Sequence, residues 1–133
     1  MRPGDALKPL RIESVSPLAM RAWALFLHDP NPIHLDPAMV KAKGLGDRVI
    51  NQGPANLAYL INMLQAALPG GSIDTLDVRY VDNVFGGDSV EAGGTVKDVF
   101  SNGGRKKLLC EVWLRADGRG PVLTGSATVS VTG

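Results

Sequence analysis

The histidines of this chain lie together in one short, proline-rich segment. Residues 28–37 read HDPNPIHLDP, and His28 and His34 are the only histidines among the 133 residues. Two prolines between Asp29 and His34 restrict the backbone and disfavour helical φ and ψ in the preceding residues, so we expect no helix there. A bend would place a carboxylate and an imidazole around one water molecule, which one group deprotonates while the other orients it. Histidine suits this chemistry because a free imidazole titrates near neutral pH.

Each of these residues also has a structural interpretation. An Asp before a Pro commonly opens a turn, and a lone His is often a structural hydrogen-bonding group. From the segment alone, both interpretations of Asp29 and His34 stay open. Asp36 precedes a proline and is better explained as a helix cap, and His28 lies at a predicted helix end, where a positive charge is favoured. We therefore expect Asp36 and His28 to be structural.

A second candidate for chemistry is Gly53, which directly precedes a long apolar segment beginning with Pro54. The backbone N–H of Gly53, at the positive end of a helix, could stabilise a developing oxyanion. Proline has no N–H, so Gly53 is the natural donor at this position. The alternative is that the glycine only permits a tight turn into the helix, and both interpretations stay open.

Helix signals occur twice around the histidine segment. Ser-Pro at residues 16–17 is a typical N-cap followed by proline at the first helical position, and apolar residues then recur at helical spacing up to Asp29. Asp-Pro at residues 36–37 repeats this signal. We expect a short second helix to about Lys43, with a glycine just beyond its end.

The remaining chain predicts one long helix and a set of strands. Residues 53–68 are apolar on nearly every side, which is typical of a buried helix. Residues 75–81, 108–115 and 126–132 alternate with period two, which predicts strands with one buried face. The expected buried residues are Leu76, Val78, Tyr80, Leu108, Cys110, Val112, Leu114, Ala127, Val129 and Val131. Residues 1–133 therefore read as a single α+β domain, with an antiparallel sheet curled around the helix.

Composition narrows the class of protein. The formal charge is +1, so the chain lacks the basic footprint of a nucleic-acid-binding protein. Cys110 is the only cysteine, so we expect neither an internal disulfide nor a cysteine metal site. The first residues lack the apolar core of a secretory signal, and no apolar run reaches membrane-spanning length. We expect a cytoplasmic protein without a metal, a nucleic-acid partner or a membrane partner.

Three stretches together resemble the MaoC-like (R)-specific enoyl-CoA hydratases and dehydratases. They are DPNPIHLDP at residues 29–37, GLGDRVINQGPANLAYL at residues 44–60 and LDVRYVDNVFGGDSV at residues 76–90. The resemblance extends from about Gly4 to Val131. It implies the hotdog fold, a long central helix wrapped by a curved antiparallel sheet. It also implies that the protein adds water to the double bond of a trans-2-enoyl-CoA to give a 3-hydroxyacyl-CoA, or catalyses the reverse reaction.

The resemblance also implies roles for single residues. Asp29 and His34 would form the catalytic pair, Asn31 would shape the same turn, and the Gly53 amide would polarise the thioester carbonyl. Gln52 stands where the family usually has histidine, and glutamine cannot exchange a proton near neutral pH. We group Asn31 and Gln52 with Gly53 as candidate substrate-binding residues.

Two further positions bear on the resemblance. The FGGD motif, with Gly87 and Asp88, matches the strand-turn signature of the family, and we interpret it as structural. Some family members carry a serine in the central helix near the substrate. This helix has no serine, and Asn62 is the nearest polar candidate.

The function predicted from the sequence is that of an enoyl-CoA hydratase. Two alternatives remain: a hotdog acyl-CoA thioesterase, against which the spacing of Asp29 and His34 argues, and a catalytically silent hotdog subunit of a heteromeric hydratase. We expect no cofactor beyond the coenzyme A carried by the substrate. We also expect a homodimer or higher oligomer, or a heteromer with a second hotdog chain, because exposed edge strands favour pairing. Candidates to bind the phosphates of coenzyme A are Arg79, Lys97, Arg105, Lys106 and Lys107.

Overall fold

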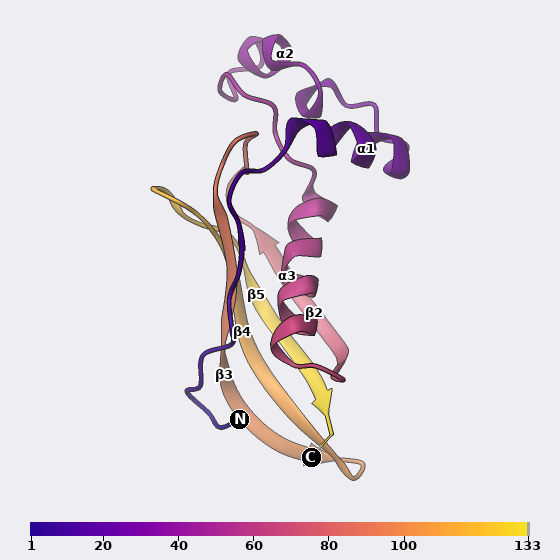
Figure 1. The fold of residues 1–133 in the computed structure, drawn as a ribbon, viewed down its shortest axis with the longest axis vertical. Helices are drawn as coiled ribbons and strands as arrows, with labels where there is room; N and C mark the ends of the chain where they lie inside the picture. Colours follow the sequence, from indigo (N-terminus) through magenta and orange to yellow (C-terminus); the bar gives the residue numbers. More distant parts are fainter. Residues whose placement is uncertain (133) are drawn as a thin grey trace.

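A curved antiparallel sheet wraps one long helix in residues 1–132, the part of the chain that the computed structural model describes (Figure 1). The strand order is β1-β3-β4-β5-β2, with every pair antiparallel. The predicted α+β class, with the sheet curved around the helix, is confirmed. In chain order the elements are β1 (Leu10–Ile12), α1 (Pro17–Leu27), the 3₁₀ helix η1 (Pro32–His34), α2 (Pro37–Ala42), α3 (Gly53–Ala67), β2 (Ser72–Tyr80), β3 (Val90–Asn102), β4 (Arg105–Ala116) and β5 (Gly120–Val131).

Period-two alternation correctly places the three strands β2, β4 and β5. In β4, all four residues of the predicted inner face are almost completely buried: Leu108, Cys110, Val112 and Leu114. Burying an aliphatic side chain of this size contributes about 1.5–3 kcal/mol, so the face is a main source of stability. The prediction that Tyr80 is buried is wrong. It is 50% exposed, and its hydroxyl donates a hydrogen bond to the Gly53 carbonyl at 3.1 Å.

The alternation pattern does not identify β3, because two buried glycines interrupt it. A Cβ atom at Gly94 would lie 2.7 Å from the Glu111 carbonyl oxygen on β4, which is closer than two such atoms can approach. A Cβ at Gly93 would lie 3.2 Å from the Trp113 ring. Gly94 occupies an inner-face position, in register with Val90, Ala92 and Val96, where the pattern expects an apolar side chain. The close approach of β4 therefore requires glycine there.

The long helix α3 is buried on one side rather than all around. Its buried residues are Ala55, Asn56, Leu60, Met63 and Leu64. The prediction of a helix buried on every side is wrong for the single chain, because the sheet covers one face of α3 and the other face is left partly open (Figure 1). The apolar residues of that second face remain half-buried.

The predicted helix caps are confirmed at α1 and α2. The Ser16 side chain accepts a hydrogen bond from the Ala19 N–H at 3.2 Å, and the Asp36 carboxylate accepts one from the Ala38 N–H at 2.9 Å. His28 caps the C-terminus of α1 with a left-handed φ of 52°. The structural interpretation of Asp36 is thereby supported by a direct contact.

Helices α1 and α2, with η1 between them, lie together at one end of the sheet, above the start of α3 (Figure 1). We call residues 17–42 the helical cap. Although the apolar residues of α1 have helical spacing, Leu18, Leu25 and Phe26 are 74%, 80% and 77% exposed, and Met20 is the buried residue of α1. No helix within residues 1–132 is long and apolar enough to cross a membrane.

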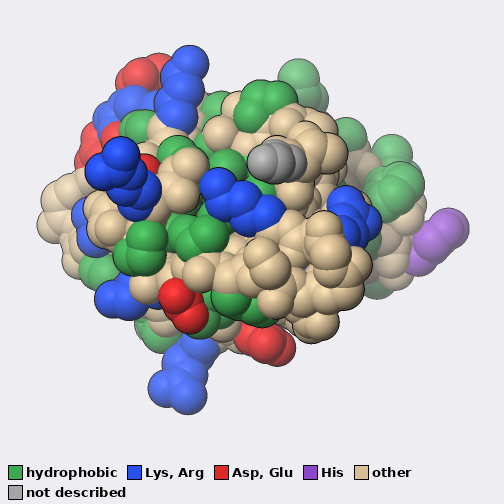
Figure 2. Space-filling model, turned by 90° about the horizontal axis from the view of Figure 1, so that it is seen from below, with side chains coloured by type: hydrophobic (Ala, Val, Ile, Leu, Met, Phe, Trp, Pro, Cys, Tyr) green, Lys and Arg blue, Asp and Glu red, His purple; other side chains and the backbone are tan. Residues whose placement is uncertain are grey.

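The opposite end of the sheet carries the turn between β3 and β4, close to the chain termini (Figure 1). Figure 2 shows this end from below, with Lys and Arg side chains at several separate places, some of them beside Asp or Glu side chains. The basic run Arg105, Lys106 and Lys107 begins β4 at this end. Within one chain, the run is therefore separated from the helical cap by the length of the sheet.

Candidate functional site

The turn that carries Asp29 and His34 is built by successive side-chain caps. The Asp29 carboxylate accepts a hydrogen bond from the Asn31 N–H at 3.1 Å, and the Asn31 side chain accepts one from the Ile33 N–H at 3.2 Å. Short polar side chains commonly cap backbone groups two residues on. Asn31 caps η1, whose first residue is Pro32. The prediction of no helix between Asp29 and His34 is therefore wrong for this single 3₁₀ turn.

The turn brings the predicted pair together. The Asp29 Oδ2 and His34 Nε2 atoms lie 3.5 Å apart, with the His34 side chain 9% exposed and that of Asp29 40% exposed. The other ring nitrogen of His34, Nδ1, lies 2.6 Å from the Ile50 carbonyl oxygen. A carbonyl oxygen only accepts, so Nδ1 carries the proton and donates it. In the neutral ring, Nε2 therefore presents a lone pair toward Asp29.

This arrangement can hold and activate a water molecule. A carboxylate oxygen and an unprotonated Nε2 are both acceptors, and they do not hydrogen-bond to each other. A water that touches both can donate one hydrogen to each, leaving its lone pairs directed away from the pair. Such a water is oriented as a nucleophile and has a base at either hydrogen.

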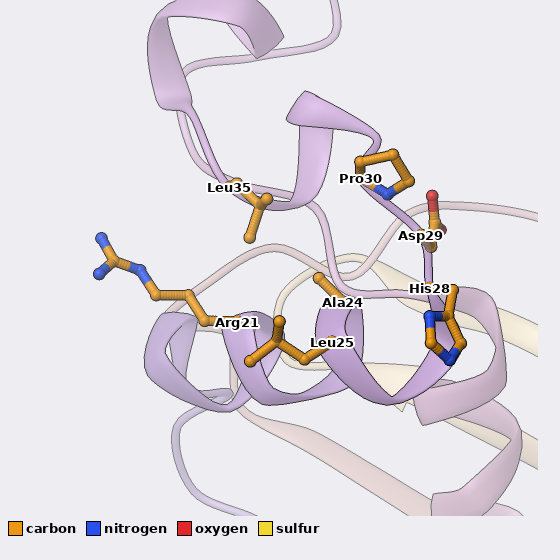
Figure 3. A pocket seen from close by; sticks show the side chains of 7 residues that line it. All are labelled: Arg21, Ala24, Leu25, His28, Asp29, Pro30 and Leu35. Carbon is orange, nitrogen blue, oxygen red and sulfur yellow. The ribbon is translucent and has the colours of Figure 1, made fainter.

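Two hollows reach this pair. The larger, of about 700 Å³, runs between α1 and the turn after it, with Asp29 at one end and Arg21 at the other (Figure 3). Its remaining lining is His28 and four apolar residues: Ala24, Leu25, Pro30 and Leu35. A smaller hollow of about 270 Å³ reaches His34 from the side of Arg48 and also includes Arg21 and Leu35. Asp29 is thus reached from the larger, mostly apolar hollow, and His34 from the smaller one.

Gly53 begins α3, as predicted, with Gln52 as its N-cap residue. The first N–H groups of a helix have no partner within it, so the Gly53 amide is available to a ligand. Ile50, which holds His34, is three residues before Gly53, and three residues span at most about 11 Å. The oxyanion candidate and the catalytic candidates therefore belong to one neighbourhood of the chain.

Gln52 and Asn31 occupy different environments. Gln52 is 1% exposed, and its Nε2 donates a hydrogen bond to the Met20 carbonyl of α1 at 2.7 Å. Its Oε1 is buried without a partner among the described residues. Asn31 is exposed and caps η1. The contacts of Gln52 thus tie the helical cap to the start of α3.

The structure adds a polar group that the sequence motifs did not single out. The Asn51 side chain donates hydrogen bonds to the Asn56 side chain at 2.8 Å and to the Tyr59 hydroxyl at 3.3 Å. Burial raises the pKa of Tyr59, and the hydrogen bond from Asn51 opposes this shift. Two features of the sequence could have indicated this group. Asn51 directly precedes Gln52 and Gly53, and the polar residues Asn56 and Tyr59 lie about one turn apart on an otherwise apolar helix. These hydrogen bonds attach Asn51, the residue after Ile50, to α3.

No three His, Cys, Asp or Glu side chains in residues 1–132 lie close enough together to hold a metal ion.

Comparison with known proteins places this chain in a family. A family model described as MaoC like domain matches residues 2–113. The (R)-hydratase from A. caviae involved in PHA biosynthesis superposes with a TM-score of 0.88 at 23% identity, covering 99% of this chain and 98% of that chain. (R)-hydratase PhaJ1 from Pseudomonas aeruginosa gives 0.84 at 18% identity, covering 98% and 82%.

A third similar structure is the ChsH1-ChsH2 complex from Mycobacterium tuberculosis, with a TM-score of 0.81 at 18% identity, covering 97% of each chain. Comparison with curated proteins gave no match. At these identities the structures establish the fold, while the family model, matching most of the sequence, establishes the family. The chain therefore belongs to the MaoC-like hydratases and dehydratases, which have the hotdog fold.

Proposed function

We propose that this protein adds water across the double bond of a trans-2-enoyl-CoA to give a 3-hydroxyacyl-CoA, or catalyses the reverse dehydration. The observation that carries the proposal is the Asp29–His34 pair, with 3.5 Å between carboxylate and imidazole and Nδ1 committed to the Ile50 carbonyl. The family membership and the (R)-hydratase neighbours support the same reaction class.

In the proposed reaction, Asp29 and His34 bind one water molecule. The water oxygen forms a bond to C3 of the enoyl group while one water proton passes to the pair. The π electrons of the C2–C3 bond move toward C2 and the thioester oxygen. C2 then takes a proton from the pair, so that one water is added in total.

The Gly53 amide has the role of oxyanion donor in this proposal. It hydrogen-bonds the thioester oxygen and stabilises the negative charge that develops there as the water attacks. The positive end of α3 acts in the same direction. Asn31 and Gln52 act on the substrate indirectly: Asn31 through the turn that it caps, and Gln52 through its hydrogen bond to α1.

The proposed substrate brings its own coenzyme A, and no further cofactor takes part. We also propose that the working protein is an oligomer, either of identical chains or with a second hotdog chain. The exposed apolar side chains of α1 and the partly open face of α3 support this, because a second chain would cover them. Two of the similar structures, both from Mycobacterium tuberculosis, are described as complexes: ChsH1-ChsH2 and the 3R-hydroxyacyl-ACP dehydratase HadBC.

The decisive experiment measures two signals during incubation with crotonyl-CoA and with longer enoyl-CoA esters. Loss of the enoyl absorbance without release of free thiol is the expected result and means hydration. Thiol release would instead identify a thioesterase. Absence of both signals until a second hotdog chain is added would identify a silent subunit. Light scattering at micromolar protein is expected to give a mass above that of the 14.0 kDa chain.

A further inference from the structure

The segment that holds His34 is itself held by the loop between β2 and β3. The Asn51 N–H donates a hydrogen bond to the Val84 carbonyl at 2.7 Å, and the Gly86 N–H donates one to the Val49 carbonyl at 2.8 Å. The backbone groups of Ile50, which lies between Val49 and Asn51, point away from this loop. Its N–H donates to the Ile33 carbonyl at 2.9 Å, and its carbonyl accepts the His34 Nδ1 proton.

Backbone hydrogen bonds therefore connect the loop to residues 49–51, and Ile50 connects these residues to His34. The loop fixes residues 49 and 51, and these fix the direction of the Ile50 carbonyl. That carbonyl determines which His34 nitrogen carries the proton and where the ring lies. A displacement of the loop is transmitted to the imidazole through a single residue.

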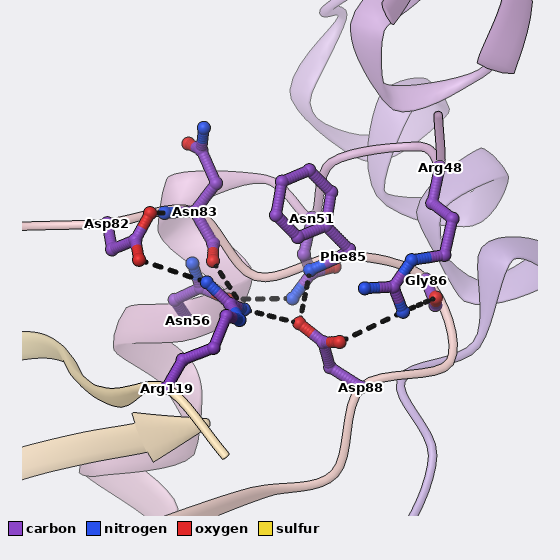
Figure 4. A network of polar contacts seen from close by, with 9 residues as sticks. All are labelled: Arg48, Asn51, Asn56, Asp82, Asn83, Phe85, Gly86, Asp88 and Arg119. Carbon is purple, nitrogen blue, oxygen red and sulfur yellow. Dashed lines mark hydrogen bonds and ion pairs between the residues drawn. The ribbon is translucent and has the colours of Figure 1, made fainter. Parts of the chain in front are cut away.

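Asp88 holds the loop in shape (Figure 4). One carboxylate oxygen accepts hydrogen bonds from the Phe85 N–H at 2.8 Å and from Arg119 at 2.6 Å, and the other accepts one from Arg48 at 3.0 Å. The two guanidinium groups also lie 5.2 Å from the centroid of the Phe85 ring. The Asp88 side chain is 11% exposed, so these contacts are partly shielded from solvent.

The two arginines connect Asp88 to the rest of the loop. Arg48 also donates to the Gly86 carbonyl at 3.0 Å, and Arg119 donates to the Asn83 carbonyl at 2.9 Å and to Asp82 at 3.0 Å. Arg48 directly precedes the segment that holds His34, and Arg119 comes from the turn between β4 and β5. Asp88 thus joins the sheet, the loop and the active-site segment through one carboxylate.

We propose that Asp88, with Arg48 and Arg119, is a positioning residue that holds the Ile50 carbonyl and thereby the orientation and tautomer of His34. This inference rests on the proposed hydratase function and deepens it. It gives Asp88 of the FGGD motif a role in the reaction, in addition to the structural role expected from the sequence. Asp88 touches neither substrate nor water in this scheme. It acts through the backbone of residues 49–51.

The first test reads His34 directly and requires no substrate. In the protein labelled with ¹⁵N, the two ring nitrogens of His34 are assigned by their absence in His34→Ala. We expect one strongly hydrogen-bonded N–H in the wild type. Asp88→Asn keeps the size of the side chain but presents an amide group to one arginine, and the His34 N–H signal should broaden or move. An unchanged His34 signal would overturn the proposal, whatever the activity of the protein.

The second test separates turnover from binding. If His34 is displaced, the rate of the chemical step falls while binding of the substrate in the ground state is retained. Asp88→Asn should therefore lower kcat by about 10- to 100-fold and change KM by less than about threefold. Asp74→Asn is the matched control. Like Asp88, Asp74 accepts hydrogen bonds from two side chains, Lys107 at 2.8 Å and Ser130. Asp74 lies near the start of β2, at the end of the sheet away from the helical cap (Figure 1). It should keep both kcat and the His34 signal.

Variants of Arg119 keep the proposal testable if Asp88→Asn does not fold. Arg119 is 30% exposed, so Arg119→Gln leaves the core intact. We expect Arg119→Gln to lower kcat and Arg119→Lys to restore part of it, since lysine keeps the charge but not the forked geometry. Equal kcat in wild type, Arg119→Gln and Arg119→Lys would overturn the proposal. If the wild type hydrates no enoyl-CoA, the proposed function fails, and the His34 signal alone decides the positioning role.

Discussion

The sheet and the helical cap of this protein are held together in different ways. In β4, four successive inward side chains are buried against α3 and the neighbouring strands. In the cap, residues 17–42, Leu18, Leu25 and Phe26 of α1 are exposed. Local polar caps and a few hydrogen bonds to Ile50 and Gln52 give the segment its shape. The difference shows that stability is concentrated in the sheet, and the candidate chemistry in a segment that contributes little core. Substitutions in the two regions should therefore separate folding from activity.

The largest effect should come from the sheet. Leu114 is fully buried in β4, and Leu114→Ala should lower the free energy of unfolding by about 2–5 kcal/mol, because it removes packed atoms and leaves a cavity. Leu25→Ala on the exposed face of α1 is the matched control and should change it by no more than about 0.5 kcal/mol. Urea denaturation of both variants at a concentration where the chain is monomeric measures the contrast. Equal losses would contradict it.

Within the cap, the proposed catalytic pair Asp29 and His34 should show the reverse behaviour. Asp29→Asn keeps the side-chain acceptor for the Asn31 N–H but removes the base, and His34→Ala removes the imidazole. Each should lower hydration by about 100-fold or more, with both proteins still folded. The double variant should be little worse than either single one, because the two groups act on the same water. Steady-state hydration of an enoyl-CoA measures this, and near-normal turnover by Asp29→Asn would refute the mechanism.

Gly53 lies where the two regions meet. A methyl group added there would lie 3.4 Å from the Tyr80 ring, an ordinary contact, so Gly53→Ala should fold. We expect hydration to fall by about 10- to 100-fold, because the methyl group would shift the amide relative to the thioester oxygen. Circular dichroism checks the fold, and turnover checks the role. Wild-type turnover would leave Gly53 only the role of a turn residue at the start of α3.

Acid should weaken the connection between the regions. Burial opposes ionisation of Asp88, but the hydrogen bonds from the Phe85 amide, Arg119 and Arg48 outweigh it and lower its pKa below the ordinary 3.8. The unfolded chain therefore binds this proton at a higher pH than the folded chain does. The stability that Asp88 contributes is complete above pH 3.8 and is lost as the pH falls through the folded pKa. Asp88→Asn should flatten the dependence of the unfolding free energy on pH below about pH 4, measured by urea denaturation.

The smallest effect is expected at the end of α1. His28 has a left-handed φ of 52°, which costs a residue with a side chain about 1 kcal/mol relative to glycine. His28→Gly should therefore raise the free energy of unfolding by about 1 kcal/mol or less and keep most of the hydration activity. Thermal denaturation and turnover check the two parts. A loss of activity comparable to that of His34→Ala would give His28 a chemical role.

The sequence by itself predicted those features that depend on neighbouring residues. The caps at Ser16 and Asp36, the alternation in β2, β4 and β5 and the end of α1 before Asp29-Pro30 all follow from conformational preferences acting over a few residues. The resemblance to the MaoC-like family added the hotdog fold and the expectation that Asp29 and His34 are catalytic.

Tertiary structure alone decided which hydrogen-bond partners those residues have. His34 donates to Ile50, 16 positions away, and Asp88 accepts from Arg48, 40 positions away, so no local preference could indicate either bond. The same holds for burial. The apolar pattern of α1 and α3 predicts helices correctly, but which faces are covered depends on where the sheet lies. Hydrophobic residues report how a segment folds locally, whereas burial and hydrogen-bond partners are determined by the packing of distant segments.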